Sequence, residues 1–421
     1  MIPFTEKLTI EFKVPDGLVS RLLRSYKDDE QKVNDEQFKT SNGWLPQTAN
    51  TPNIGGIDYL GALFFPNYRN LSAITTDQNQ LERVVQAVGS ELVTRGTALE
   101  NAAILEGRSK LTASNVEFAV KAIVTEFLDY IPELRLNLKE DVVAVLNKDP
   151  SIEGLYIVIL NNNGYQSVET NRVAHFFYER ELNGLARDMA EDAKNRFNFD
   201  IHPGTKLGKR IVFDHQGAVI GESAEIGEDS TLYQGVTLGA YAFQFEDRKV
   251  IRIDKRHPTI GNRNTVYSYA QILGGNVITG DDVIIGAETV ILGGTKGVYI
   301  GNESKVLPGT HINGGPFKGD GYGVYIGSKV LIFPNAGIDG GHRGITVGDN
   351  SRIALGAQVL GRSSVRYGGR INIGNNSKVL PGVVLLHSIE PGTKYGGLTK
   401  YIHDFLAINF NGIIARHNHK G

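Results

Sequence analysis

Three short segments of the chain place histidine next to carboxylate or guanidinium side chains. They are Asp200-Ile-His202-Pro203, Asp214-His215 and Arg256-His257-Pro258. A histidine near neutral pH can take a proton from a hydroxyl group, which is a poor nucleophile while it is protonated. A carboxylate can hold the imidazole ring in one tautomer, and the planar fork of an arginine can pair with a substrate carboxylate. These residue types suit general-base chemistry on a small polar substrate, although a structural role before proline is the alternative for His202.

A repeating pattern after residue 200 indicates the scaffold that would position these side chains. An aliphatic residue followed by glycine recurs at steps of six residues or nearly multiples of six, as in Ile220-Gly221, Ile226-Gly227 and Ile260-Gly261. A hexapeptide rhythm is typical of a solenoid whose short strands each point one aliphatic side chain inward, while glycine permits the turn at the corner. Stacked coils bury a continuous aliphatic column. The pattern predicts a left-handed parallel β-helix, an architecture used mostly by acyltransferases.

The sequence before the repeats favours helices. Apolar residues recur at helical spacing after Asp77, and a further helix is expected to begin at Pro132 and to stop at Asp149-Pro150. Only 11 of the 50 glycines lie in residues 1–200. We therefore expect an α + β chain of four parts, namely an irregular extension over 1–75, an α-helical domain over 76–198, a β-helix over 199–398 with extra coils, and a tail over 399–421.

Composition excludes several classes of function. The net charge is −2, which gives no electrostatic basis for binding nucleic acid or an anionic membrane, and cysteine is absent. No apolar stretch is long enough to span a bilayer. The absence of cysteine fits a cytoplasmic protein. The first residues carry Glu6 and Glu11 and lack the apolar core that a signal peptide has. His417 and His419 alone do not fill a zinc site, so no metal is expected.

Several motifs within residues 136–290 resemble those of the serine O-acetyltransferases, which acetylate L-serine with acetyl-CoA ahead of cysteine synthesis. The matching segments are Asp141-Val-Val-Ala-Val with Asp149-Pro150, Arg172-Val-Ala-His175, Asp200-Ile-His202-Pro203, Asp214-His215 with Gly221-Glu222, the coil from Tyr233 to Gly239, Arg256-His257-Pro258, and Tyr269 to Gly274. Each motif is weak alone, but their common order and approximate spacing make the resemblance specific.

The resemblance implies roles for the amino-acid site. His215 would be the general base, and Asp200, about one coil earlier, would orient its ring. Arg256 would bind the carboxylate of the amino acid with His257 beside it. Asp214 and Asp141 are the anions available for its ammonium group. Transfer would be direct, without a covalent enzyme intermediate, because no cysteine or activated serine is evident.

The resemblance also implies a co-substrate groove and an assembly. Acetyl-CoA would lie between neighbouring solenoids, and position alone places Gly239, Ala240, Tyr269 and Ala270 along it. The chain would form a homotrimer or a dimer of trimers. Apolar side chains such as Val236, Ile272 and Val290 are expected to supply the contacting faces.

The chain also departs from the family pattern. The segment from Asp214 to Glu222 is one residue shorter, and a deletion beside the base could be absorbed at Gly217 or could alter the acceptor pocket. Extra coils occupy residues 300–390, and glycine-rich segments at 313–323 and 337–344 make this part less regular.

The carboxyl-terminal residues also differ, because the family's last isoleucine, which docks into cysteine synthase, is missing; this argues against a cysteine synthase complex. One alternative function is O-acylation of another amino acid or a specialised metabolite. The other is a non-catalytic trimeric scaffold, against which the joint presence of the candidate site residues argues.

Overall fold

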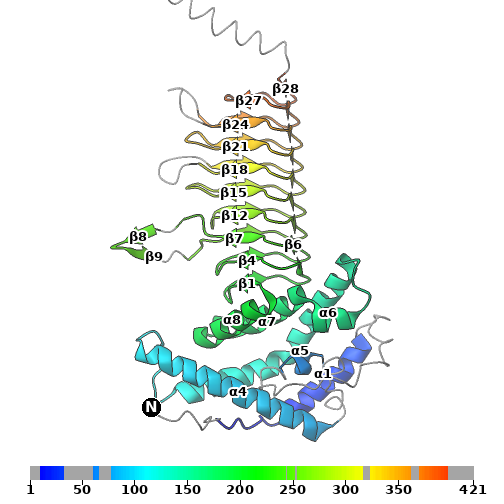
Figure 1. The fold of residues 1–421 in the computed structure, drawn as a ribbon, viewed down its shortest axis with the longest axis vertical. Coiled ribbons are helices and arrows are strands. Elements are labelled where there is room, and N and C mark those ends of the chain that lie inside the picture. The colour runs from blue at the N-terminus through cyan, green and yellow to red at the C-terminus, as the bar shows by residue number, and fades with distance from the viewer. Residues whose placement is uncertain are drawn as a thin grey trace, which may run out of the picture. The chain divides into compact units, whose positions relative to one another are not determined.

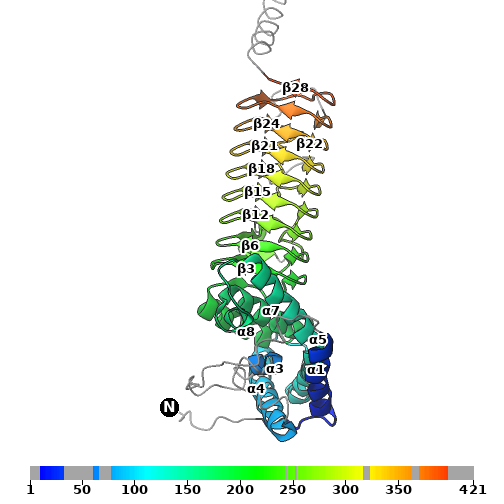
Figure 2. The same cartoon turned by 90° about the vertical axis from the view of Figure 1, so that its right-hand side faces the viewer.

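The computed structural model describes residues 10–32, 60–65, 77–242, 244–251, 254–315, 323–361 and 369–396. The chain divides into two compact units, Met1–Glu222 and Ser223–Gly421. The first unit contains helices and four short strands, and the second contains only strands and turns within its described residues (Figures 1 and 2). The predicted fold class, helices followed by a left-handed parallel β-helix, is confirmed.

The helices of the first unit pack around one apolar cluster. Their bounds are α1 (Leu18–Lys32), α3 (Leu60–Phe64), α4 (Gln78–Leu105), α5 (Val116–Lys148), α6 (Leu155–Asn161), α7 (Asn163–Glu179) and α8 (Asn183–Phe197). The Asp77 side chain caps α4 by accepting the backbone N–H groups of Asn79 and Gln80, as its polar character before an apolar run suggests.

The expectation that a new helix begins at Pro132 was wrong. Helix α5 continues through this proline for 33 residues. A proline inside a helix costs one backbone hydrogen bond and a steric clash. The buried stripe on either side of it, which includes Leu128, Ile131, Leu134 and Leu138, offsets that cost because its packing fixes both halves of α5 on the same core.

Four strands complete the first unit. They are β1 (Asp200–Ile201), β2 (Lys206–Leu207), β3 (Val212–Asp214) and β4 (Val219–Ile220). Strand β4 pairs in parallel with β1, with Asp200 opposite Val219, so β1 to β3 form one complete coil and β4 begins the next.

The second unit winds its strands into three parallel sheets, with consecutive strands of a coil in different sheets. The first sheet contains β7 (Thr237–Gly239), β12 (Gln271–Leu273), β15 (Val290–Leu292), β18 (His311–Asn313), β21 (Gly337–Asp339), β24 (Gln358–Leu360) and β27 (Val384–Leu385). The second contains β5 (Glu225–Ile226), β10 (Thr259–Ile260), β13 (Val277–Thr279), β16 (Val298–Ile300), β19 (Val324–Ile326), β22 (Ile345–Val347) and β25 (Ile371–Ile373). The third contains β6 (Thr231–Tyr233), β11 (Thr265–Val266), β14 (Ile284–Ile285), β17 (Lys305–Val306), β20 (Leu331–Ile332), β23 (Arg352–Ile353), β26 (Lys378–Val379) and β28 (Lys394–Tyr395). An antiparallel hairpin, β8 (Gln244–Glu246) and β9 (Lys249–Ile251), leaves the stack between β7 and β10 (Figure 1).

The core of the second unit is the predicted aliphatic column. Leu238, Ile272 and Ile291 follow one another in register on the first sheet, and each is fully buried. This finding corrects the expectation that Val236 and Ile272 lie on outer faces, because both side chains are fully buried within a single chain. Both side chains point into the coil, so they cannot form contacts between protomers.

The extra coils are more regular than their sequence suggests. On the first sheet the register advances by 21 residues from Val290 to His311, by 26 to Gly337, by 21 to Gln358 and by 26 to Val384. This part of the chain is therefore a tandem repeat of a two-coil unit, in which a shorter and a longer coil alternate. The segment 337–344 contains strand β21 and only a short loop, while residues 316–322 of the other glycine-rich segment lie outside the described residues.

Candidate active site

His215 lies in the turn that follows β3. Its backbone is left-handed with φ 61°, and Gly217 two residues later also has a positive φ. The same left-handed backbone recurs at other corners of the solenoid, as at Asp229, Arg263 and Asp282, so it is the ordinary corner geometry that sets the backbone at His215. The shortened segment is therefore accommodated by left-handed backbone at both residues. The side chain is 73% exposed, and its Nε2 lies 3.7 Å from Oδ1 of Asp214.

Asp200 lies at the same corner of the solenoid, one coil earlier. Its backbone N–H donates to the carbonyl of Ala218, and the N–H of Gly217 donates to the carbonyl of Asn198. The topology thus brings the Asp200 and His215 segments together. However, the carboxylate of Asp200 accepts a hydrogen bond from Nζ of Lys194 at 2.8 Å, and this bond raises the pKa of the Lys194 ammonium.

Asp141 is fully buried on α5. Both of its oxygens accept hydrogen bonds from Arg172 of α7, at 2.7 and 2.9 Å, and Oδ1 also accepts the backbone N–H of Ile211. Burial raises the pKa of the Asp141 carboxyl, while the Arg172 charge and the hydrogen bonds act in the opposite direction. Arg172 donates in addition to the carbonyls of Leu207 and Gly208, so this ion pair joins two helices to the first coil.

His202 takes part in backbone hydrogen bonding. Its Nδ1 accepts the N–H of Gly204 at 3.0 Å, and its carbonyl accepts a bond from the Asn171 side chain. These contacts fit the structural alternative. At the end of the first unit, Tyr178 donates to Glu222 at 2.6 Å.

In the second unit, Ser223 organises the Arg256-His257 segment. Its Oγ accepts the backbone N–H groups of Arg256 at 3.0 Å and His257 at 3.2 Å. Its own backbone N–H donates to Nδ1 of His257. Because Nδ1 is an acceptor, the proton of the neutral imidazole resides on Nε2. Lys255 donates to the Ser223 carbonyl at 2.7 Å and lies 3.4 Å from Glu225.

Ser223 was not singled out in the sequence, since its contacts bridge more than 30 positions. His257 itself is buried and Arg256 is half-buried.

The four residues expected along the co-substrate groove differ in accessibility. Tyr269 is 59% exposed in a left-handed turn, and its ring covers Gly235, where an added Cβ would lie 2.4 Å from the Tyr269 ring. Gly239 and Ala240 are half-buried. Ala270 is fully buried, and its carbonyl accepts the N–H of Thr237, so its main chain serves the coil itself.

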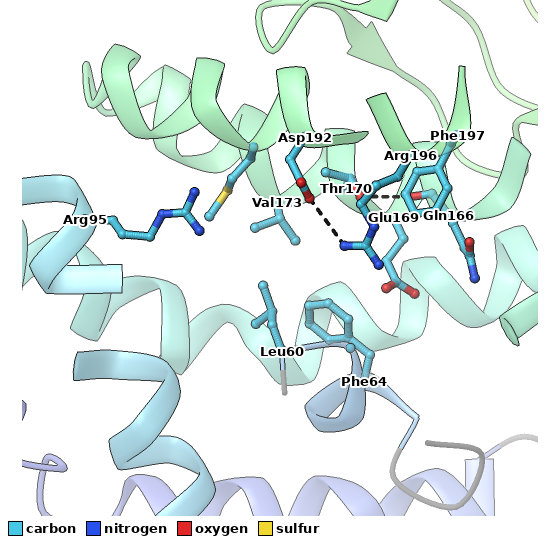
Figure 3. A pocket seen from close by; sticks show the side chains of 12 residues that line it. Leu60, Phe64, Arg95, Gln166, Glu169, Thr170, Val173, Asp192, Arg196 and Phe197 are labelled. Carbon is cyan, nitrogen blue, oxygen red and sulfur yellow. Dashed lines mark hydrogen bonds and ion pairs between the residues drawn. The ribbon is translucent and has the colours of Figure 1, made fainter. Parts of the chain in front are cut away.

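The described residues also contain a cavity of about 110 Å³ in the first unit, between α3, α4, α7 and α8 (Figure 3). It contains none of the candidate site residues. Its arginines are paired locally, Arg196 with Asp192 at 3.3 Å and Arg95 with Asp188, and Glu169 accepts a hydrogen bond from the Tyr165 hydroxyl. In the described ranges no cluster of three metal-ligating side chains occurs, and no helix there combines the length and apolar character that crossing a bilayer requires.

Comparison with known proteins relates the chain to one family. Residues 68–170 match the family model described as "Serine acetyltransferase, N-terminal". A serine acetyltransferase of Helicobacter pylori is 37% identical over 175 residues, which is 41% of this chain and 97% of that protein. One of Mycobacterium tuberculosis is 36% identical over 184 residues, 43% of this chain and 76% of that protein. The crystal structure of Entamoeba histolytica serine acetyltransferase 1 in complex with L-cysteine superposes with a TM-score of 0.54 and 28% identity, covering 65% of this chain and 93% of that one.

Proposed function

The chain belongs to the serine acetyltransferase family and is an acyltransferase, and from this premise we propose that it transfers the acetyl group of acetyl-CoA directly to the hydroxyl of L-serine. The observation that carries the proposal is the position of His215, whose Nε2 lies 3.7 Å from Asp214 and whose turn is hydrogen-bonded to the segment of Asp200. A histidine held this way and open to solvent can serve as a base.

The proposed reaction has two steps, attack of the hydroxyl on the thioester and departure of the thiol. His215 takes the proton of the serine hydroxyl while that oxygen attacks the carbonyl carbon of the thioester. The carbon–sulfur bond then breaks, and the sulfur leaves with the proton that His215 returns. A carboxylate stabilises the imidazolium that forms between the two transfers. We assign that role to Asp200, which must then release or share its hydrogen bond with Lys194.

Amino-acid binding is assigned to groups that match its charges. Arg256 pairs with the carboxylate. The Nε2–H group of His257 is a further donor, because the Ser223 N–H donates to Nδ1 and so leaves the proton of the neutral ring on Nε2. Asp214 receives the ammonium. Asp141 is already bound to Arg172 and fully buried, so its contribution is to hold α5 and α7 against the first coil. The L-cysteine complex of the Entamoeba relative supports an amino-acid ligand, because cysteine carries the same charged groups as serine.

We further propose that acetyl-CoA binds along a groove bounded by Gly239, Ala240 and the exposed Tyr269 ring, between the protomers of a cytoplasmic trimer or dimer of trimers. Because Ala270 uses its main-chain groups within the coil, its part in the groove is to shape the wall.

A thiol-release assay with acetyl-CoA and a panel of amino acids tests the proposal. L-serine should give the highest kcat/KM. Higher turnover with another amino acid would favour the alternative acceptor, for which the shortened turn at His215 is the motivating feature. No release with any acceptor, from a folded protein, would favour the scaffold.

A further inference from the structure

The outer face of the third sheet carries a column of cations in the extra coils. Lys305, Leu331, Arg352, Lys378 and Lys394 occupy one register position on five successive strands. The four cations are exposed. None of their side chains has an ion pair or hydrogen bond to another described residue.

This charge is not compensated within the repeat. The 47-residue offset that relates Lys305 to Arg352 also relates Leu331 to Lys378. In the first copy, Glu303 pairs with Lys329 at 3.5 Å. The second copy has Asn350 and Asn376 at those positions, so both members of this pair are absent, while Lys378 stands where the first copy has Leu331.

Neighbouring strands lie roughly 4.8 Å apart, well inside the screening length at physiological salt, and like charges directly opposite each other destabilise a sheet. The column therefore costs the free protein stability, which a bound anionic partner would offset.

A second column lies beside the first. Leu307, Phe333, Ala354 and Leu380 each follow a column position by two residues, and their backbone N–H groups continue the same ladder, as in Leu307 to Ile332 and Leu380 to Tyr395. Side chains two residues apart on a strand point to the same side. All four are half-exposed. The face thus offers a basic stripe and an apolar stripe, both parallel to the solenoid axis.

We propose that this face binds an amphipathic, acidic α-helix of a partner protein, lying along the solenoid axis. A carboxylate on every helical turn repeats at about 5.4 Å. The spacing of the helix turns, about 5.4 Å, exceeds the spacing of the coils, about 4.8 Å, so over the two steps from Arg352 through Lys378 to Lys394 the difference adds up to only about 1.2 Å, which flexible side chains absorb. An extended acidic strand repeats at about 6.8 Å on one face, so its mismatch is about 4 Å.

Phosphates of a nucleic-acid duplex repeat at about 3.4 Å along each strand, which does not match the spacing of the coils. A planar membrane presents a two-dimensional array of charge, so it would not require the cations to lie in a single row. Apolar residues on the adjoining side of the helix would pack on Leu307, Phe333 and Leu380. The interaction does not depend on acetyl transfer.

The test uses the full chain and a labelled helical peptide with glutamate on every turn and leucine on the adjoining stripe. Fluorescence anisotropy should show saturable, salt-sensitive binding. A peptide of the same composition with its glutamates dispersed around the helix should bind at least about tenfold more weakly.

The double variant Arg352→Glu/Lys378→Glu should weaken binding by about tenfold or more, since two favourable pairs become repulsive. The milder Arg352→Ser/Lys378→Ser should weaken it by less. Lys296→Glu, a single charge reversal at an exposed cation in the loop after β15, is the control for the single variant Lys378→Glu and should leave binding unchanged, while Lys378→Glu should weaken it.

Equal binding of the two peptides, or an unchanged Kd in both double variants, would overturn the proposal. So would stronger binding of single-stranded DNA or phosphatidylserine vesicles at the same salt. A changed oligomeric state in the double variants, seen by light scattering, would assign the face to self-association instead. Acetyl transfer should be unaffected in every variant, so loss of the proposed function would register separately.

Discussion

Replacement of Asp141 by alanine distinguishes a structural role from a substrate-binding role. The carboxylate is fully buried and receives two hydrogen bonds from Arg172, whose side chain is only 11% exposed. Removing one partner of a buried pair leaves the other charge uncompensated and typically costs about 3–5 kcal/mol. Because Arg172 keeps a little solvent access and two carbonyl acceptors, we expect a loss near 3 kcal/mol, at the lower end of that range.

Thermal unfolding followed by circular dichroism measures this loss. For a unit of this size, each kcal/mol shifts the midpoint by roughly 2–4 °C, so Asp141→Ala should lower it by about 6–12 °C. The double variant Asp141→Leu/Arg172→Met should recover part of the loss, because it removes both charges together. In Asp141→Ala, KM for serine measured below the transition should change little.

The opposite pattern would refute this reasoning. If Asp141→Ala melts within a degree of wild type while KM for serine rises tenfold or more, the carboxylate contacts the substrate and the Arg172 pair contributes little to stability. An equal loss in the double variant would show that the charges are not coupled.

Three further variants test other contacts of the candidate site. Ser223→Ala removes the oxygen that accepts the Arg256 and His257 N–H groups and should raise KM for serine about tenfold, whereas Ser223→Thr should stay close to wild type. If both variants have the same KM for serine, Ser223 does not contribute to the site. Lys194→Met removes the hydrogen bond that the Asp200 carboxylate accepts and should raise kcat a few-fold, whereas Lys194→Arg, which keeps a donor, should stay close to wild type; the same kcat in both variants would mean that Asp200 does not act on His215. Arg256→Lys keeps the charge but loses the bidentate fork and should raise KM for serine more than KM for acetyl-CoA, whereas a change in the acetyl-CoA constant alone would place Arg256 in the co-substrate groove.

The sequence predicted the architecture because the inward positions of a solenoid depend on short-range pattern. Aliphatic residues before a corner glycine, such as Ile220, Ile226 and Leu238, enter the core, and that pattern is visible in the sequence alone. Leu273 and Leu355 also precede glycine but do not, because the inward position of their coils falls one or more residues away. Val236 and Ile272 were expected on the outer faces, but both are fully buried, because alternation along a two- or three-residue strand does not by itself show which side faces inward. Helix α5 passed through Pro132 because tertiary burial outweighed a local breaker.

Other features depend on contacts between distant residues. Ser223 meets Arg256 across a whole coil and the β8–β9 hairpin, so no local spacing reveals it. The two-coil repeat was hidden because steps of 21 and 26 residues are not multiples of six. The hydrogen bond from Lys194 to Asp200 depends on how the end of α8 lies against β1, and the order of residues in the sequence does not show that placement.

In the proposed reaction His215 removes the proton of the acceptor hydroxyl. The most direct test is the steady-state rate of coenzyme A release with saturating acetyl-CoA and L-serine for wild type and for His215→Ala, alongside acetyl-CoA binding by calorimetry. We expect kcat to fall by about 10²–10⁴-fold, the usual contribution of a positioned general base, with acetyl-CoA affinity unchanged. Turnover within a few-fold of wild type in His215→Ala would contradict the account.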